Sequence, residues 1–358
     1  DIKDSMAALS DNKKEIDKLF KYKFEDNVLK GLSFGDIFLY AMNEVYGGNV
    51  TASIENSSKI LNITGRVLPV TQDKIDICAE LEDGTIIKEK NKIPEVVYDK
   101  VSKINRIFIA PSNCKPAPGV LEAIAEADAI VIGPGSLYTN VIPNLLVKNV
   151  AKAIKDSKAF KIYISNIMTQ PGQTDNYSIS DHIDAIFEHA GDGIVDYCIC
   201  DTGEIVPEYV RMYNKRGSDM VERDIQNVKN KNINIIQKDL SSIEDEHIRH
   251  NPETIASTIM ELICSDLKFK DQQYDTQYIL LNSKLKDQRK KEKKKQKETK
   301  GAKREKQKVQ KKENKRIKSR SKFNEKYSER IRDIKRSDSS RERNKELFEK
   351  TGSLYDKK

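Results

Sequence analysis

Between residues 106 and 265, short apolar runs alternate with segments whose apolar residues recur every three or four positions. Short runs of this kind predict strands, and the helical spacing predicts amphipathic helices. Strands that alternate with helices form βαβ units, so this region predicts a parallel sheet covered by helices on both faces. We expect strands at 106–110, 129–133, 161–167, 195–200 and 233–239, and helices at 118–127, 142–157, 180–189, 208–213 and 252–265.

The first hundred residues have a different pattern. Residues 1–46 are predicted to be mainly helical. Residues 60–90 favour short antiparallel strands at 62–70, 74–81 and 85–90, with a turn at Asp83–Gly84. We expect these strands to form a small antiparallel ribbon inserted into the α/β fold.

Charge divides the chain into two regions. The residues from Asp271 to the end contain 32 Lys and Arg against 15 Asp and Glu, a net charge of +17, whereas residues 1–270 contain 32 and 41, a net charge of −9. We therefore predict an α/β domain over 1–266 and a basic low-complexity tail over 267–358. The tail has no apolar face, so it is predicted to be disordered or a solvated helix. It is either a solvated appendage or a nonspecific binder of RNA or another polyanion.

The cysteine and histidine residues suggest no metal site. Five cysteines, at 78, 114, 198, 200 and 264, have a spacing that matches no zinc or disulfide framework, which favours a reducing compartment. Cys198 and Cys200 alternate along a predicted strand and are expected in the core. The four histidines form no ligand pattern. No apolar run approaches the roughly 18–20 residues of a membrane helix, and the start, Asp-Ile-Lys-Asp-Ser-Met, is not a signal peptide.

Gly133-Pro134-Gly135-Ser136 follows a predicted strand and precedes a predicted helix. Glycines let a ligand approach the backbone closely, and free N–H groups at a helix start favour an anion. Ser136 and Thr139 can cap the helix or donate to a ligand oxygen. The loop is therefore either a phosphate site or an ordinary tight turn.

The loop over 166–175 is rich in amide and hydroxyl groups and also connects a strand to a helix. Such groups recognise sugar hydroxyls or a base edge, although an ordinary connection has the same composition. Ser178 or Ser180 is predicted to cap the next helix, so Asp181 in its first turn is as consistent with capping as with catalysis. Tyr213 and Arg249 are either surface residues or contacts to a diphosphate or base.

Five stretches together resemble the gluconeogenesis factor family (YvcK-type), a bacterial branch of the superfamily that includes 2-phospho-L-lactate transferase. They occur in family order and span the chain up to about residue 266. The stretches are LSFGDIFL at 32–39, NITGRVLPVT at 62–71, VIGPGSLYTNVIPNLLV at 131–147, SNIMTQPGQTDNYSISDHIDAI at 165–186 and IRHNPETIA at 248–256.

The resemblance implies a Rossmann-like α/β fold, here a three-layer sandwich with a mostly parallel sheet. It implies a cytoplasmic regulator without catalysis that binds UDP-N-acetylglucosamine and balances carbon flow into cell-wall precursors, and thereby cell shape, on gluconeogenic carbon sources. The partner it implies is glucosamine-6-phosphate synthase, and a homo-oligomer is compatible with it. The transferase branch would instead bind a guanosine nucleotide and use magnesium.

The resemblance also assigns residues to this site. Gly133, Gly135 and Ser136 would face the diphosphate. The ligand crevice would be lined by Thr169, Gln170 and Asp175, and the nucleotide sugar would contact Tyr213 and Arg249.

The sequence departs from the family pattern at its start. The family's Gly-Gly-Gly-Thr-Gly loop has no counterpart, which suggests that the first βα unit is missing and that this is a fragment or a trimmed chain. Lys3 and Asp4 replace Arg and Asn, Leu32 and Asp36 replace His and Asn, and Gln173 replaces Glu. Asp4 and Asp36 are expected to repel a diphosphate unless a cation lies between them.

Overall fold

The computed structural model describes residues 2–25, 27–100 and 102–265, together with a few positions between 280 and 290. The chain divides into two compact units, residues 1–271 and 272–358. The boundary that the sequence suggests at 266/267 stays a prediction. The disordered or helical character of the basic tail also stays a prediction, because most of the tail lies outside the described residues.

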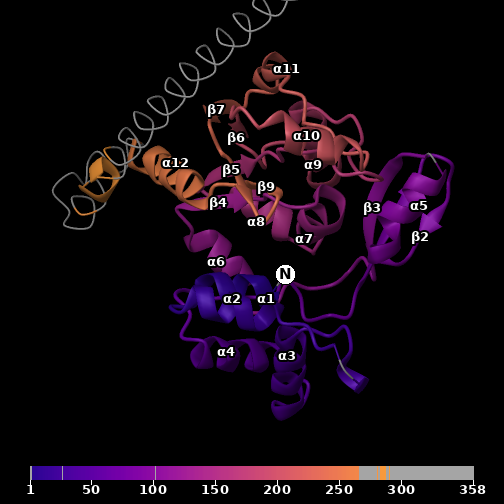
Figure 1. Ribbon diagram of the computed structural model, residues 1–358, viewed down its shortest axis with the longest axis vertical. Coiled ribbons are helices and arrows are strands. Elements are labelled where there is room, and N and C mark those ends of the chain that lie inside the picture. Colours follow the sequence, from indigo (N-terminus) through magenta and orange to yellow (C-terminus); the bar gives the residue numbers. More distant parts are fainter. Residues whose placement is uncertain are drawn as a thin grey trace, which may run out of the picture. The chain divides into compact units, whose positions relative to one another are not determined.

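A four-stranded parallel sheet forms the centre of the first unit (Figure 1). Its strands are β4 (Ala129–Ile132), β5 (Phe160–Ile164), β6 (Tyr197–Asp201) and β7 (Asn234–Lys238), in the order β4-β5-β6-β7. All three neighbouring pairs are parallel. The α/β class and the parallel sheet predicted from the sequence are therefore confirmed.

Helices cover both faces of this sheet. Alternate side chains of a strand point to opposite faces, so neighbouring residues of one strand pack against different helices. Tyr163, Cys198 and Cys200 belong to the large core cluster, which also contains residues of α7 (Ile142–Leu145), α9 (Ile179–Ala190) and α11 (Ile225–Asn230). The neighbouring Ile162 and Ile199 pack on α12 (Pro252–Ser265) instead. This is the predicted three-layer arrangement, and both cysteines are fully buried as expected.

A second, antiparallel sheet contains β1 (Asp76–Leu81), β2 (Ile86–Ile87) and β3 (Ile104–Ala110) in the order β2-β1-β3. The predicted hairpin around residues 83–84 is present, with Gly84 at φ +80°. Two predictions are wrong. Residues 62–70 form no strand, and 106–110 does not continue the parallel pattern, because β3 pairs antiparallel with β1. Helix α5 (Ile93–Lys100) follows the short 3-10 turn η2 (Lys90–Lys92).

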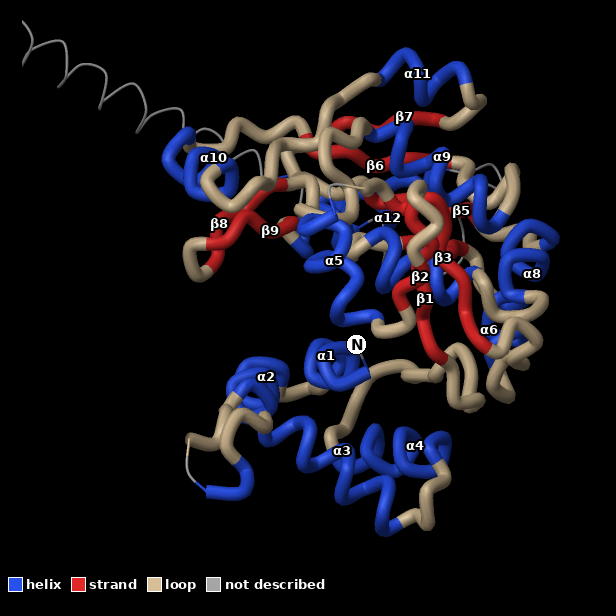
Figure 2. The backbone as a smooth tube through the Cα atoms, turned by 90° about the vertical axis from the view of Figure 1, so that its right-hand side faces the viewer, coloured by secondary structure: helices blue, strands red, loops and turns tan. Residues whose placement is uncertain are grey.

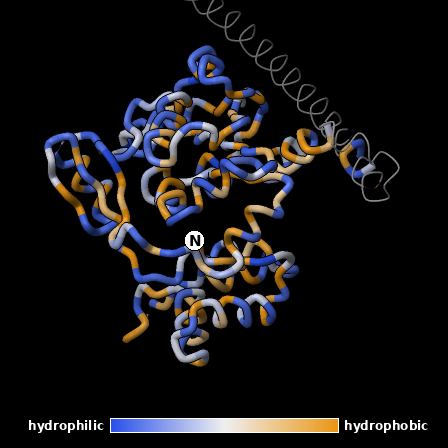
Figure 3. The backbone as a smooth tube through the Cα atoms, turned by 180° about the vertical axis from the view of Figure 1, so that it is seen from behind, coloured by the Kyte–Doolittle hydropathy of each residue, from blue (hydrophilic) through white to orange (hydrophobic). Residues whose placement is uncertain are grey.

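The N-terminal region is a group of helices, as predicted: α1 (Ile2–Leu9), α2 (Lys13–Lys21), α3 (Phe34–Val45) and α4 (Val50–Ile60), with a 3-10 turn η1 (Asn27–Leu29) (Figure 2). Met6, Phe20 and Ile54 form their shared core, against which Phe34 and Phe38 pack. Figure 3 shows hydrophobic and hydrophilic residues alternating along these helices, as expected of helices with one apolar face.

The helix predicted at 142–157 is interrupted. A π-helical turn η3 (Leu137–Val141) leads into the short α7, and α8 (Val150–Asp156) begins only after a break at 146–149. The prediction of one continuous helix is wrong because Asn149 takes a left-handed conformation, φ +66°, which interrupts the helix and precedes the start of α8.

The remaining helices, α6 (Val120–Glu126) and α10 (Pro207–Asn214), agree with the predictions. The structure also contains a hairpin of β8 (Ser241–Glu244) and β9 (His247–His250), which was not predicted from the sequence. Within the described part of the chain, no helix combines the length and apolar character needed to cross a membrane.

Candidate functional site

Three segments meet at the carboxyl ends of the parallel strands, which is where open α/β sheets bind their ligands. The loop after β4 contacts the loop after β5, because the Asn166 side-chain amide donates to the Gly135 carbonyl oxygen at 3.1 Å. The hairpin β8–β9 reaches the same place, since His250 Nε2 lies 3.0 Å from the carbonyl oxygen of Ser165. Burial lowers the pKa of His250. These contacts give one continuous surface built from distant parts of the sequence.

The loop at 133–136 is shaped by backbone constraints. Gly133 has φ +80°, and a Cβ atom there would lie 3.2 Å from the Ile164 carbonyl oxygen, so a side chain at this position would be strained. Ser136 starts the helical segment but its side chain makes no capping hydrogen bond. Of the two roles open to Ser136, capping is therefore not used, and its hydroxyl can still donate to a ligand.

The same loop borders a groove of about 520 Å³ along β4. Gly133, Gly135 and the amides of Asn140 and Asn144 contribute polar groups, and residues of β4, α6 and α8 supply an apolar wall. β4 is the edge strand of its sheet, and Val131 in it is 42% exposed. The groove thus combines an apolar wall with a few polar backbone and amide groups, which is typical of small-molecule sites.

The three site residues predicted in the 166–175 loop, Thr169, Gln170 and Asp175, have separate roles. Thr169 is buried, and its hydroxyl accepts a hydrogen bond from the Asp219 backbone N–H at 2.9 Å, which ties the loop to residues 218–219. The backbone of Gln170 closes a turn, in which its N–H donates to Thr174 Oγ1 at 2.9 Å. Asp175 lies away from the 133–136 groove, because it lines a different cleft of about 430 Å³ that also includes Asp181.

The structure brings Tyr213 and the strand that carries Arg249 together. The Ile248 backbone N–H donates to the Tyr213 hydroxyl at 3.2 Å, which fixes α10 against β9. Arg249 is exposed and lies between Ile248 and His250, whose ring contacts Ser165. Because successive side chains of a strand point to opposite faces, the Arg249 side chain lies on the face of β9 opposite that of Ile248 and His250.

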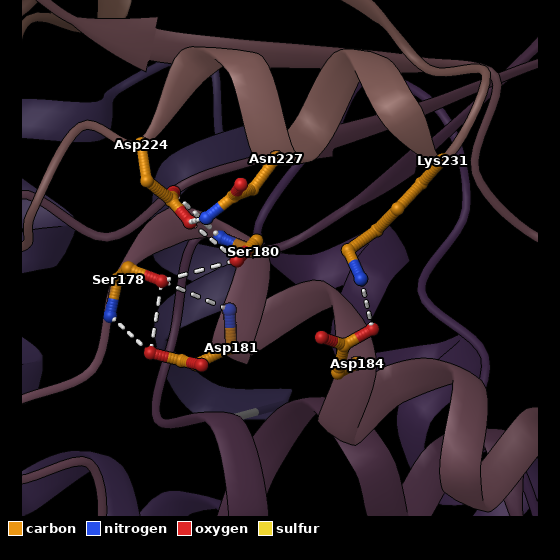
Figure 4. A network of polar contacts seen from close by, with 7 residues as sticks. All are labelled: Ser178, Ser180, Asp181, Asp184, Asp224, Asn227 and Lys231. Carbon is orange, nitrogen blue, oxygen red and sulfur yellow. Dashed lines mark hydrogen bonds and ion pairs between the residues drawn. The ribbon is translucent and has the colours of Figure 1, made fainter.

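Asp181 acts as a capping residue. Ser178 and Asp181 form a capping box at the start of α9, with the Ser178 N–H donating to Asp181 Oδ2 at 2.7 Å (Figure 4). Ser180 next to it donates through its backbone N–H to Asp224 at 3.0 Å and also through its hydroxyl. Burial raises the pKa of Asp224, but the hydrogen bonds from Ser180 and Asn227 outweigh this, so the net shift is downward. The network joins α9 to α11 and leaves Asp181 a structural role.

Asp36 forms an ion pair with Lys3, whereas the expected repulsion of a diphosphate by Asp4 and Asp36 stays a prediction. Lys3 Nζ lies 2.8 Å from Asp36 Oδ1, and Ser33 completes a capping box with Asp36 at the start of α3. The hydrogen bond from Lys3 and those from Ser33 lower the pKa of Asp36 to about 2. Lys3 and Asp36 thus form an ion pair that holds α1 against the start of α3.

A small cavity between the ends of β5 and β6 is lined by Asp201, Asn166 and Arg223. Asn166 opens the amide-rich loop predicted from the sequence, whereas neither Asp201 nor Arg223 was predicted as a site residue. The available signal was the position of Asp201, an acidic residue at the end of a buried strand. Among the described residues, no group of three or more His, Cys, Asp or Glu is arranged to hold a metal ion.

A parallel α/β sheet with polar loops at the carboxyl ends of its strands is the architecture of a Rossmann-like ligand-binding protein. Sequence comparisons agree with this class. Residues 1–241 match the family model described as 2-phospho-L-lactate transferase CofD. The gluconeogenesis factor of Bacillus subtilis is 36% identical over 264 residues, 74% of this chain and 82% of the relative. The gluconeogenesis factor of Halalkalibacterium halodurans is 40% identical over 263 residues, 73% of this chain and 80% of the relative. This chain is therefore a member of the gluconeogenesis factor family, within the CofD group.

The fold comparison gives the same result. A crystal structure of a UPF0052 family protein from Bacillus halodurans is 39% identical and superposes with a TM-score of 0.69, covering 73% of this chain and 82% of that one. A longer relative from Clostridium acetobutylicum is 38% identical over 289 residues, which are 81% of this chain but only 64% of that protein. The family and its fold are thereby established for this chain.

Proposed function

We propose that this chain binds a nucleotide sugar, UDP-N-acetylglucosamine, at the carboxyl ends of β4 to β6 and acts as a regulator rather than a catalyst. In the cytoplasm, the bound sugar nucleotide would report the supply of cell-wall precursors and shift the population of conformations that engage a partner enzyme. Glucosamine-6-phosphate synthase, which the family resemblance implies, is the partner we propose. Control of carbon flow and cell shape would follow from that contact.

The observation that carries the proposal is the meeting of the 133–136 loop, the 165–166 segment and β9 through the Asn166–Gly135 and His250–Ser165 contacts. Under this proposal, the Ser136 hydroxyl, which makes no capping hydrogen bond, and the exposed Arg249 guanidinium would supply neutral and charged donors to the ligand. A diphosphate accepts from both kinds of donor, and arginine binds it in a bidentate manner. The amide-rich loop adds partners of the type that sugars use.

The test is calorimetric titration of the full chain with UDP-N-acetylglucosamine, with a guanosine diphosphate titration beside it. We expect micromolar binding of the uridine ligand and weaker binding of the guanosine ligand. Arg249→Ala should weaken binding about 10- to 100-fold, since a charge-assisted hydrogen bond contributes about 1.5–3 kcal/mol. Absence of heat with both ligands would refute the proposal.

Arg66→Ala is a matched control for this substitution. Arg66 is also an exposed arginine, but it lies in the 62–70 loop beside α4, where it lines another cavity. Its removal should leave the affinity unchanged. An equal loss in both variants would show that Arg249 acts only through the overall charge of the protein.

The match to the transferase family model over residues 1–241 favours one second candidate, transfer of a phospho-lactyl-type group to or from a nucleotide. Magnesium would be needed only under this alternative. Turnover of a guanosine-linked substrate that requires added magnesium would support the transferase, and binding of the uridine sugar without turnover would support the regulator.

A further inference from the structure

Asp201 has one side-chain oxygen that nothing in the described residues uses. Its Oδ1 atom accepts three backbone hydrogen bonds, from Gly203 at 3.1 Å, Leu240 at 2.7 Å and Ser241 at 2.9 Å. Its Oδ2 atom has no hydrogen-bond partner among the described residues. This oxygen is buried, and the whole residue is only 7% exposed. An unpaired buried carboxylate oxygen is costly, so its retention calls for a partner that the protein itself does not provide.

The position of Asp201 connects it with the proposed ligand site. It ends β6 and lines a small cavity together with Ser165 and Asn166, from the loop after β5. Asn166 is the residue that donates to Gly135, and Ser165 is the one that His250 contacts. The cavity that Asp201 lines is therefore connected to the 133–136 loop through Asn166, which lines the cavity and donates to Gly135.

Arg223 lines the same cavity and provides the complementary group. It is exposed, and no hydrogen bond or ion pair holds its guanidinium within the described residues. Its charge acts on Cys200, the neighbour of Asp201: burial raises the pKa of that thiol to about 11, and Arg223 opposes the shift. An acceptor and a cationic donor thus lie at one small cavity.

We infer that this cavity is a hydroxyl subsite of the nucleotide-sugar site, an inference that rests on the function proposed above. The space fits about one water-sized group, which excludes a ring. A hydroxyl both donates and accepts, so it can donate to Asp201 Oδ2 while it accepts from Arg223. A phosphate oxygen cannot donate, and a base N–H cannot accept. The hydroxyl belongs either to the ribose or to the attached sugar.

The experiment is calorimetric titration of the full chain, wild type and Asp201→Asn, with UDP and with UDP-N-acetylglucosamine. The asparagine side chain keeps an oxygen for the three backbone donors. We expect affinity to fall about 10- to 100-fold, as for loss of a charge-assisted hydrogen bond. A loss with both ligands identifies a ribose hydroxyl, because UDP has no other; a loss with UDP-N-acetylglucosamine alone identifies the sugar.

Two further variants sharpen the test. Asp196→Asn makes the same substitution at the amino end of β6, where Asp196 pairs with Lys161, and should leave both affinities unchanged. Arg223→Gln replaces the cationic guanidinium with a shorter, neutral amide at an exposed position that does not threaten folding, and should weaken binding roughly 3- to 10-fold. Thermal melting of each variant shows whether it is folded.

The outcomes distinguish a failure of the hydroxyl subsite from a failure of the proposed nucleotide-sugar binding. Wild-type binding that is unchanged in both Asp201→Asn and Arg223→Gln overturns the hydroxyl subsite and leaves the proposed function standing. A lower melting temperature with unchanged affinity would also overturn it, since Asp201 would then be only structural. A wild-type chain that binds neither ligand overturns the proposed function and the subsite with it.

Discussion

Gly172 is the position where the amide-rich loop touches the antiparallel region, and Gly172→Ala should destabilise the protein strongly. Gly172 has φ +72°, and a Cβ atom there would lie far inside van der Waals contact with the Pro94 carbonyl group of α5. An alanine in this left-handed region costs about 1–2 kcal/mol. Displacing backbone on both sides adds about 1–3 kcal/mol, the usual cost of overpacking.

Gly193→Ala is the matched control for this prediction. Gly193 has φ +79°, but a Cβ atom there would have no neighbour within 4 Å, so only the backbone cost applies. Since about 1 kcal/mol shifts the melting temperature of a domain of this size by roughly 2–4 °C, Gly172→Ala should melt roughly 3–10 °C below Gly193→Ala. Calorimetric or circular-dichroism melting of both variants measures the difference. Equal melting temperatures would refute the contact between the loop and α5.

Two further predictions concern titratable groups. The folded pKa of Asp36, about 2, lies below the ordinary unfolded value of about 3.9, so its stabilisation is complete above pH 4 and is lost as pH falls toward 2. Asp36→Asn should therefore lower the free energy of unfolding in urea at pH 7, by under about 1 kcal/mol for this half-exposed pair, and the difference should vanish near pH 2; a constant difference would contradict the Lys3 pairing. All five cysteines are buried and burial raises the pKa of Cys200 to about 11, so a thiol reagent should react with five thiols only after unfolding. Rapid reaction of the native protein would show that one of them is accessible.

The local sequence pattern was sufficient to predict those strands and helix ends that depend only on burial and on neighbouring residues in the chain. The central strands of the parallel sheet, β5 and β6, are buried on both faces, so they occur as short apolar runs that the sequence shows directly. Helix ends follow from local chemistry in the same way: Ser178 caps α9 and Gly191 ends it with φ +79°, as the side-chain types predict. The 133–136 loop was found because glycines next to a strand end are visible without any partner.

The partners of these elements were not visible in the sequence. The run at 106–110 predicts a strand, but pairing with β1 rather than with the parallel sheet depends on residues nearly thirty positions away. The helix at 142–157 was predicted whole because its apolar spacing continues across Asn149, whose backbone conformation only the tertiary packing selects. Arg249 was predicted without any strand around it, whereas the structure places it in the β8–β9 hairpin, whose Ile248 contacts Tyr213.

The sequence by itself determined the α/β class, the family motifs and the polar character of both loops, because these depend on residue type and short-range spacing. Only the tertiary structure decided that Asp175 faces a separate cleft, that Asp181 is a cap, and that Asp201 keeps a buried, unpaired oxygen beside Arg223. The physical reason is that hydrogen-bond satisfaction and burial are properties of atoms from several distant segments at once. No window of the sequence contains them together.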